Sequence, residues 1–164
     1  EPATNRAERL RNNIIEKLEN LNKLKELTYI NLALNNIKKI ENMEGCESLM
    51  KIDLTANFVD IEDWEESCEN LKKVPQIAEI YLTGNPVQEY ILLFGEISNW
   101  GFSWKGWKDF LIAVVDQIKY VDGKEILNSE RILAKQSYKD LLEDLRTKVE
   151  MKRVEELANR KLFS

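Results

Sequence analysis

The stretch YINLALNNIKKIENMEGCESLMKIDLTANFV, from Tyr29 to Val59, contains the same pattern of apolar residues twice. Four positions recur 22 residues later with the same or a similar residue: Ile30, Leu32, Asn35 and Ile37 are followed by Ile52, Leu54, Asn57 and Val59. With Leu27 and Leu49 as first members, both copies fit the pattern L-x-x-L-x-L-x-x-N-x-I. Self-similarity at a fixed period indicates a repeat architecture, in which one repeat cannot bury its apolar side alone.

Further copies extend the pattern in both directions. A third copy follows 28 residues on, closed by Pro86, and partial copies flank the array: Ile77, Ile80, Leu82 and Asn85; Leu10, Asn13 and Ile15; Ile118 and Val121. This is the signature of leucine-rich repeats, which stack short parallel strands along a concave face. The sequence therefore predicts an α/β fold, a leucine-rich-repeat solenoid forming a short right-handed arc with a parallel concave sheet, a C-terminal cap and a long terminal helix.

An asparagine occupies the same position in the three full copies and in the first partial copy, where the chain leaves the strand and turns inward. Its side-chain amide both donates and accepts, so it can satisfy backbone groups that the turn would otherwise bury unpaired. We therefore expect a structural role, and no ligand contact, for a ladder of Asn13, Asn35, Asn57 and Asn85.

Residues between the frame positions are expected on the concave face, because side chains alternate along a strand. They should form columns across the strands: Tyr29, Lys51, Glu79 and Tyr120, and beside them Asn31, Asp53, Tyr81 and Asp122. Aromatic side chains on a rigid surface suit protein recognition. The candidate protein-binding residues are therefore Tyr29, Asn31, Lys51, Asp53, Glu79, Tyr81 and Tyr120. The alternative is a merely solvated concave face, with partners bound at edges or caps.

Two segments depart from the regular repeat. Residues 60–76 expand one repeat, and we expect a longer helix there with Trp64 packing inward. Residues 87–107 form an insert rich in aromatic residues. One interpretation is a helix and loop that cover the end of the core. The other is an aromatic docking surface, with Trp100 and Trp104 as weaker candidates for protein binding.

From residue 128 the sequence is rich in Glu, Lys, Arg, Leu and Ala and contains no Gly or Pro. We expect one long helix over 128–164, capped by Asn128 or Ser129, whose first turns dock on the cap. Its later turns would project into solvent or enter a coiled coil, but the pattern is too irregular to assign an oligomeric state. The predicted organisation is thus 1–127 for the repeats with their insert, and 128–164 for the cap helix and candidate start of a coiled coil.

The composition argues against several classes of function. The 164 residues include no His and two Cys, so histidine-based triads and the commonest zinc ligand are missing. We find no phosphate-binding glycine motif and no metal-ligand spacing, and therefore expect no catalytic residue, metal or cofactor. A net charge of −5 argues against a nucleic-acid partner. No apolar run or signal core points to a membrane, and two scattered thiols favour a reducing, cytosolic setting.

Several stretches resemble one known family. NLALNNI (31–37), ENMEGCESL (41–49), EIYLTGNP (79–86) and DGKEILNSERI (122–132) are similar to the repeats and cap of tilB-type leucine-rich-repeat proteins, which are axonemal dynein assembly factors. The resemblance covers roughly residues 10–140 and implies a non-enzymatic, co-chaperone-like scaffold for cytoplasmic preassembly of dynein arms. It implies other assembly factors, chaperone-associated ATPases and dynein subunits as partners. The implied location is the cytoplasm, with the cilium or flagellum as a second site.

Other functions remain open at this point. Cytosolic leucine-rich arcs with 22-residue repeats also serve as regulatory or targeting subunits of Ser/Thr protein phosphatases. A light-chain-like structural subunit of the axoneme is a further alternative. An enzyme is the weakest class, because the sequence carries no His and no catalytic motif.

Overall fold

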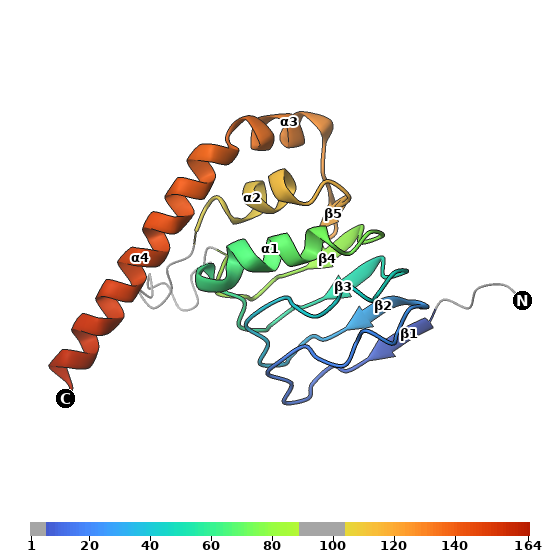
Figure 1. Cartoon of the computed structure of the whole chain (residues 1–164), viewed down its shortest axis with the longest axis horizontal. Helices are drawn as coiled ribbons and strands as arrows, with labels where there is room; N and C mark the ends of the chain where they lie inside the picture. The colour runs from blue at the N-terminus through green and yellow to red at the C-terminus, as the bar shows by residue number, and fades with distance from the viewer. Residues whose placement is uncertain (1–5, 89–103) are drawn as a thin grey trace, which may run out of the picture.

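The computed structural model describes residues 6–88 and 104–164. A six-stranded sheet runs through it in chain order, with five parallel strands and an antiparallel sixth (Figure 1). The strands are β1 (Arg6–Arg9), β2 (Leu27–Asn31), β3 (Lys51–Asp53), β4 (Glu79–Tyr81), β5 (Tyr120–Val121) and β6 (Lys124–Glu125). Each predicted copy of the frame supplies one parallel strand, so the predicted leucine-rich-repeat fold is confirmed.

The frame residues form the core. Leu27, Ile30 and Leu32 and their counterparts in the next two repeats are at most 1% exposed. Burying an aliphatic side chain of this size contributes about 1.5 to 3 kcal/mol. Because each strand presents the same alternation, neighbouring repeats join their apolar sides into one continuous cluster.

The expanded repeat forms the longer helix predicted for it, together with a short 3₁₀ helix before it. A short 3₁₀ helix, η1 (Ile61–Asp63), leads into α1 (Trp64–Lys72), which packs beside α2 (Trp107–Val114). Asp60 starts η1 by accepting the Ile61 N–H at 2.7 Å. Trp64 is fully buried, as predicted, and its indole N–H donates to the Trp107 carbonyl at 3.0 Å.

Hydrogen bonds from the ladder asparagines tie neighbouring repeats together. The Asn57 amide donates to the carbonyls of Leu32 at 2.9 Å and Leu54 at 3.1 Å, and its oxygen accepts the Ile37 N–H at 3.1 Å. Asn35 and Asn85 make the equivalent bonds one repeat earlier and later, and all three are at most 3% exposed. The structural role predicted for the ladder is confirmed for these three asparagines, whereas Asn13 is exposed and bonds only to the Leu10 carbonyl of its own turn.

The C-terminal region forms two helices where one was predicted. α3 (Asn128–Gln136) and α4 (Tyr138–Leu162) meet at Ser137 and run in different directions (Figure 1). The predicted cap is also wrong, since α3 begins after extended Leu127 with no side-chain cap. The sequence between 128 and 162 is compatible with an unbroken helix, so tertiary contacts cause the change of direction.

Those contacts come from α2. The Arg131 guanidinium donates to the carbonyls of Ile112, Val115 and Ile118, where α2 ends and the chain enters β5. Tyr138 stacks on Phe110 with ring centroids 5.9 Å apart. α3 is therefore held along α2, and α4 must leave in another direction to reach the side of the repeat array.

α4 docks first through apolar contacts and then through charge. Leu145 is 1% exposed, whereas Lys152 pairs with Asp60 and Glu62, each at 2.7 Å. Burial alone would lower the pKa of Lys152, but the two carboxylates outweigh it and raise that pKa above its usual value. Beyond this contact α4 is exposed, as predicted for its later turns.

We expect Asn57→Ala to lower the free energy of unfolding by about 3 kcal/mol, because it leaves buried backbone groups without partners. Asn13 is the matched control, since it is exposed and bonds to the Leu10 carbonyl of its own turn. Asn13→Ala should cost less than about 1 kcal/mol. Urea unfolding measures both, and equal losses would contradict the structural role of the ladder.

Lys152→Met should weaken the docking of α4 and cost about 1 to 2 kcal/mol, because two carboxylates lose their partner. Hydrogen exchange should then accelerate from residue 146 onward and stay unchanged in α3. Arg153→Met is the control, since the Arg153–Glu150 pair is exposed and 3.9 Å apart. Unchanged exchange in the Lys152 variant would show that this ion-pair cluster does not hold α4.

Candidate protein-binding surface

The strand register brings the predicted columns together. Across β2 to β5, Tyr29 pairs with Lys51, Lys51 with Glu79, and Glu79 with Tyr120. The second column aligns Asn31, Asp53 and Tyr81 across β2 to β4. All seven residues are partly or largely solvent-exposed, whereas the residues between them are buried. The predicted alternation is correct, and the seven candidates share one surface.

Four of these residues form a connected group, which we call the concave cluster: Tyr29, Lys51, Glu79 and Tyr81. The Lys51 Nζ lies 5.0 Å from the ring centroids of both Tyr29 and Tyr81. Each such cation–π contact contributes about 0.5 to 1 kcal/mol at an exposed site. The lysine of β3 is therefore held between the tyrosines of β2 and β4.

Glu79 completes the concave cluster through Tyr81. The Tyr81 hydroxyl donates to the Glu79 carboxylate at 2.8 Å, and this hydrogen bond raises the pKa of Tyr81 above its usual value. This hydrogen bond and the contact with Lys51 together fix the position of the Tyr81 ring. Sequence reasoning placed these residues together, but it could not show which of them would pair.

The second column carries a structural role that sequence reasoning missed. The Asn31 side-chain oxygen accepts the Ala33 N–H at 3.1 Å, and the Asp53 carboxylate accepts the Thr55 N–H at 2.9 Å. Asp122 accepts the Leu82 N–H at 2.7 Å. For Asn31 and Asp53, an Asx residue two positions before an N–H that needs a partner is the signal that could have shown this role. The binding role of Asn31 and Asp53 stays a prediction.

The aromatic insert is described only in part. Trp100 lies outside the described residues. Trp104 is 2% exposed, packs against Phe110 and donates its indole N–H to the Asp144 carboxylate at 2.7 Å. At this end the insert thus contributes to the core, which favours the covering role over the docking role for Trp104.

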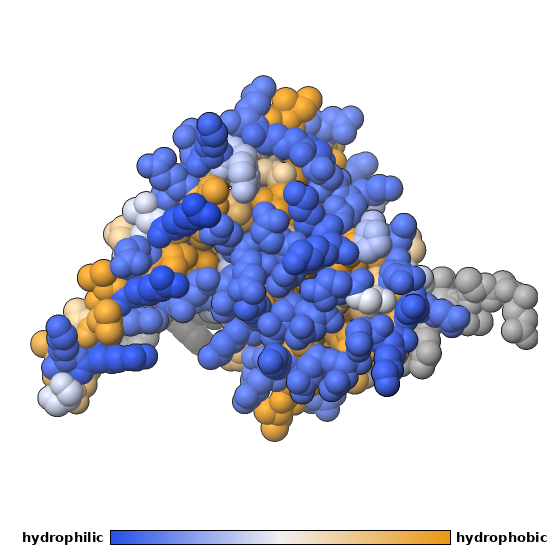
Figure 2. All heavy atoms as spheres, viewed as in Figure 1, coloured by the Kyte–Doolittle hydropathy of each residue, from blue (hydrophilic) through white to orange (hydrophobic). Residues whose placement is uncertain are grey.

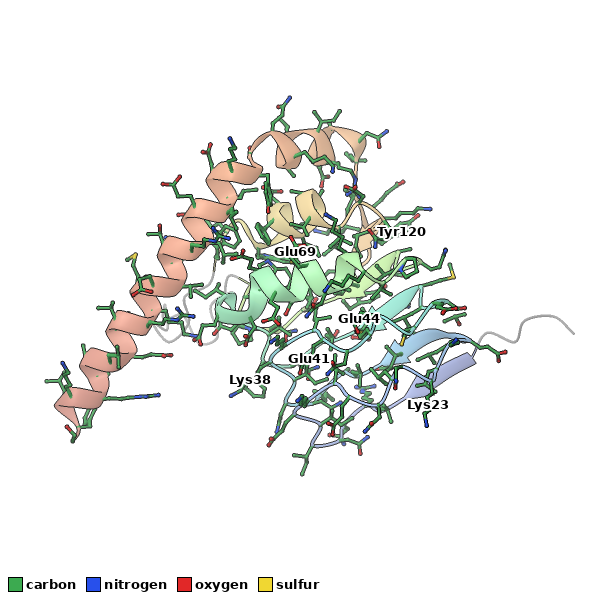
Figure 3. The ribbon with its side chains drawn as sticks, in the orientation of Figure 1. Lys23, Lys38, Glu41, Glu44, Glu69 and Tyr120 are labelled. Carbon is green, nitrogen blue, oxygen red and sulfur yellow. The ribbon has the colours of Figure 1, made fainter. Side chains whose placement is uncertain are left out.

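The side that faces the viewer differs from the concave cluster. Figure 3 labels residues of this side on the segments that connect one strand to the next, on α1 and on β5: Lys23, Lys38, Glu41 and Glu44; Glu69; and Tyr120. Figure 2 shows this side as mostly hydrophilic, with apolar residues along α4. The exposed apolar residues of α4 include Met151, Val154 and Leu157. Lysine and glutamate side chains are both labelled on this side.

Among the described residues, neither the two thiols nor the acidic side chains form an evident catalytic or metal-binding arrangement. Cys46 and Cys68 are buried, and burial raises the pKa of both thiols, which disfavours the reactive thiolate. Within 6–88 and 104–164, no group of three His, Cys, Asp or Glu side chains is arranged to hold a metal ion. No helix in the same part of the chain is long and apolar enough to cross a membrane.

The repeats and their buried asparagines define a leucine-rich-repeat protein. A solved structure of the Drosophila melanogaster SNF/U2A′ complex contains a chain with this fold, at a TM-score of 0.57 and 20% identity. The match covers 88% of the present chain and 90% of the other. At this identity the likeness shows the fold alone. A scan against protein-family models finds no match.

Sequence comparison identifies the type of leucine-rich-repeat protein. Proteins named dynein axonemal assembly factor 11 are 38% identical in Mus musculus over 137 residues and 47% identical in Homo sapiens over 129 residues. They match 84% and 79% of the chain. In Trypanosoma brucei brucei the identity is 36% over 79% of the chain. Over the matched residues, the chain belongs to this tilB-type family.

The match covers only part of the relatives. The chain spans 25% of the mouse protein and 30% of the trypanosome protein. The family resemblance stated from the motifs is confirmed for the repeats.

Proposed function

We propose that this chain is a protein-binding region that acts in the assembly of axonemal dyneins. The observation that carries the proposal is 36–47% identity, over most of the chain, to proteins named as axonemal dynein assembly factors. These relatives span mammals and a trypanosome. Their names favour an assembly role over the phosphatase-subunit and light-chain alternatives.

The concave sheet suits such a role. It offers three tyrosines and a lysine on adjacent parallel strands, and the stacked core fixes the strands. A surface that is ordered before binding loses little conformational entropy when a partner docks. Aromatic side chains add contact area at low entropic cost. The chain would thus act by holding a partner and without catalysing a reaction.

The proposed partners are other assembly factors, chaperone-associated ATPases and dynein subunits. In this proposal, dynein arms are assembled before they reach the axoneme. The chain would therefore act in the cytoplasm, with the cilium or flagellum as a second location. The partner would contact the concave cluster, and the exposed end of α4 would extend beyond the repeats.

Deleting the gene in the ciliated organism that encodes it should remove inner and outer dynein arms and leave the microtubule doublets intact. Electron microscopy of axoneme cross-sections measures this directly. Intact arms would contradict the proposed function. A pulldown that recovers phosphatase catalytic subunits without assembly factors would then favour the phosphatase alternative.

The triple variant Tyr29→Ala, Lys51→Ala, Tyr81→Ala should weaken binding of the partner at least about a hundredfold, because it removes the centre of the contact surface. The variant should remain folded, with its free energy of unfolding lowered by about 1 to 2 kcal/mol for the two lost cation–π contacts, since all three side chains lie outside the core. The matched control, Lys23→Ala, Lys38→Ala, Glu44→Ala, changes three residues away from the strands and should bind normally. Unchanged affinity of the first variant would exclude the concave face as the binding surface.

A further inference from the structure

We propose that Lys51 and the Tyr29 hydroxyl together bind a single carboxylate of a partner protein, carried on a segment whose neighbouring side chains are apolar. This inference rests on the proposed function of the concave face and adds the chemistry by which the partner is recognised.

Lys51 is fixed in position without an anionic partner. Its ammonium lies between two tyrosine rings, 5.0 Å from each centroid. Among residues 6–88 and 104–164, no carboxylate oxygen lies within 4.0 Å of the Lys51 Nζ, so Lys51 forms no ion pair there. Lys39, Lys135 and Lys152, by contrast, each pair with a carboxylate. Lys51 is half-buried, and a partly desolvated charge gains more from a matching carboxylate than a fully exposed one.

The nearest candidate within the sheet, Glu79, is engaged elsewhere. It lies directly opposite Lys51 in the register of β3 and β4, yet its carboxylate accepts from the Tyr81 hydroxyl at 2.8 Å. This arrangement leaves the three ammonium protons of Lys51 available. Without the Tyr81 hydrogen bond, a Lys and a Glu directly opposite each other on adjacent strands would be expected to form an ion pair.

A second donor lies beside Lys51. Tyr29 pairs directly with Lys51 between β2 and β3, and its ring contacts the ammonium. In the part of the chain that is described, the Tyr29 hydroxyl makes no hydrogen bond of its own. An ammonium and a phenol on adjacent strands can both donate to one carboxylate, which accepts through two oxygens.

The surroundings limit the partner to one negative charge at this point. Asp53 follows Lys51 by two residues on the same strand, and Glu79 faces it from the next. A run of acidic residues, or a phosphate with nearly two charges, would be repelled by both carboxylates. Tyr120, which is 41% exposed in the same column as Glu79, extends the aromatic contact area. The site therefore favours an isolated Asp or Glu between apolar residues.

The experiment uses a random peptide library displayed on phage, selected in parallel on the wild-type chain, on Lys51→Met and on the control Lys38→Met. Peptides enriched on the wild type and on the control should share one Asp or Glu flanked by apolar residues, and Lys51→Met should not enrich them. Changing that acid to its amide in a synthetic peptide should weaken binding at least about tenfold, as expected for a charge-assisted pair. Lys51→Glu should select peptides with Lys or Arg at the same position.

Three results would overturn the inference. They are enrichment of the same peptides on Lys51→Met, equal affinity for the acid and its amide, and selection of polyacidic or phosphorylated sequences in its place. Thermal unfolding of each variant shows whether it is folded, and Lys51 lies outside the core, so a folding defect would not imitate the effect.

The two proposals can fail separately. Intact dynein arms in the deletion strain would remove the proposed function and leave the peptide result standing. Missing arms together with peptide binding that ignores Lys51 would keep the assembly role and remove the carboxylate contact.

Discussion

Hydrogen bonds from a buried asparagine in each of the three central repeats, Asn35, Asn57 and Asn85, tie the stacked strands of this fold together. Each repeat turns inward after its strand and would bury backbone groups without partners. The ladder amide donates to carbonyls of its own and the preceding repeat, and its oxygen accepts an N–H of the preceding repeat. Because these bonds cross from one repeat to the next, they also fix the spacing of the strands. The register of the concave columns follows from that spacing.

The binding surface inherits its rigidity from this arrangement. Lys51 touches the rings of Tyr29 and Tyr81 only because β2, β3 and β4 are in register. The buried residues between the surface positions keep the strands from shifting. A side chain that would be flexible on a loop is therefore held at the centre of the sheet. This is the physical basis for assigning recognition to the concave face.

Much of this could be predicted from the sequence, because the repeat fixes both periodicity and register. The frame gave the strands, the buried asparagines and the two columns of surface residues. The frame could not show which surface residues interact. Glu79 accepts a hydrogen bond from Tyr81 although Lys51 lies directly opposite it, and this depends on side-chain geometry. The helix break at Ser137 was also hidden, because it depends on contacts that Arg131 and Tyr138 make with a distant helix. The repeat pattern also did not indicate that the residue before each ladder asparagine has a positive φ, at Asn12, Leu34, Ala56 and Gly84, which costs backbone strain at Leu34 and Ala56 but not at the glycine.

The central claim joins the concave face to the assembly of dyneins. The most direct test restores the gene to the deletion strain as the Tyr29→Ala, Lys51→Ala, Tyr81→Ala variant and examines axoneme cross-sections. The account predicts that the variant protein accumulates normally and that the dynein arms stay missing, while the Lys23→Ala, Lys38→Ala, Glu44→Ala variant restores them. Arms restored equally by both variants would show that assembly does not depend on this surface.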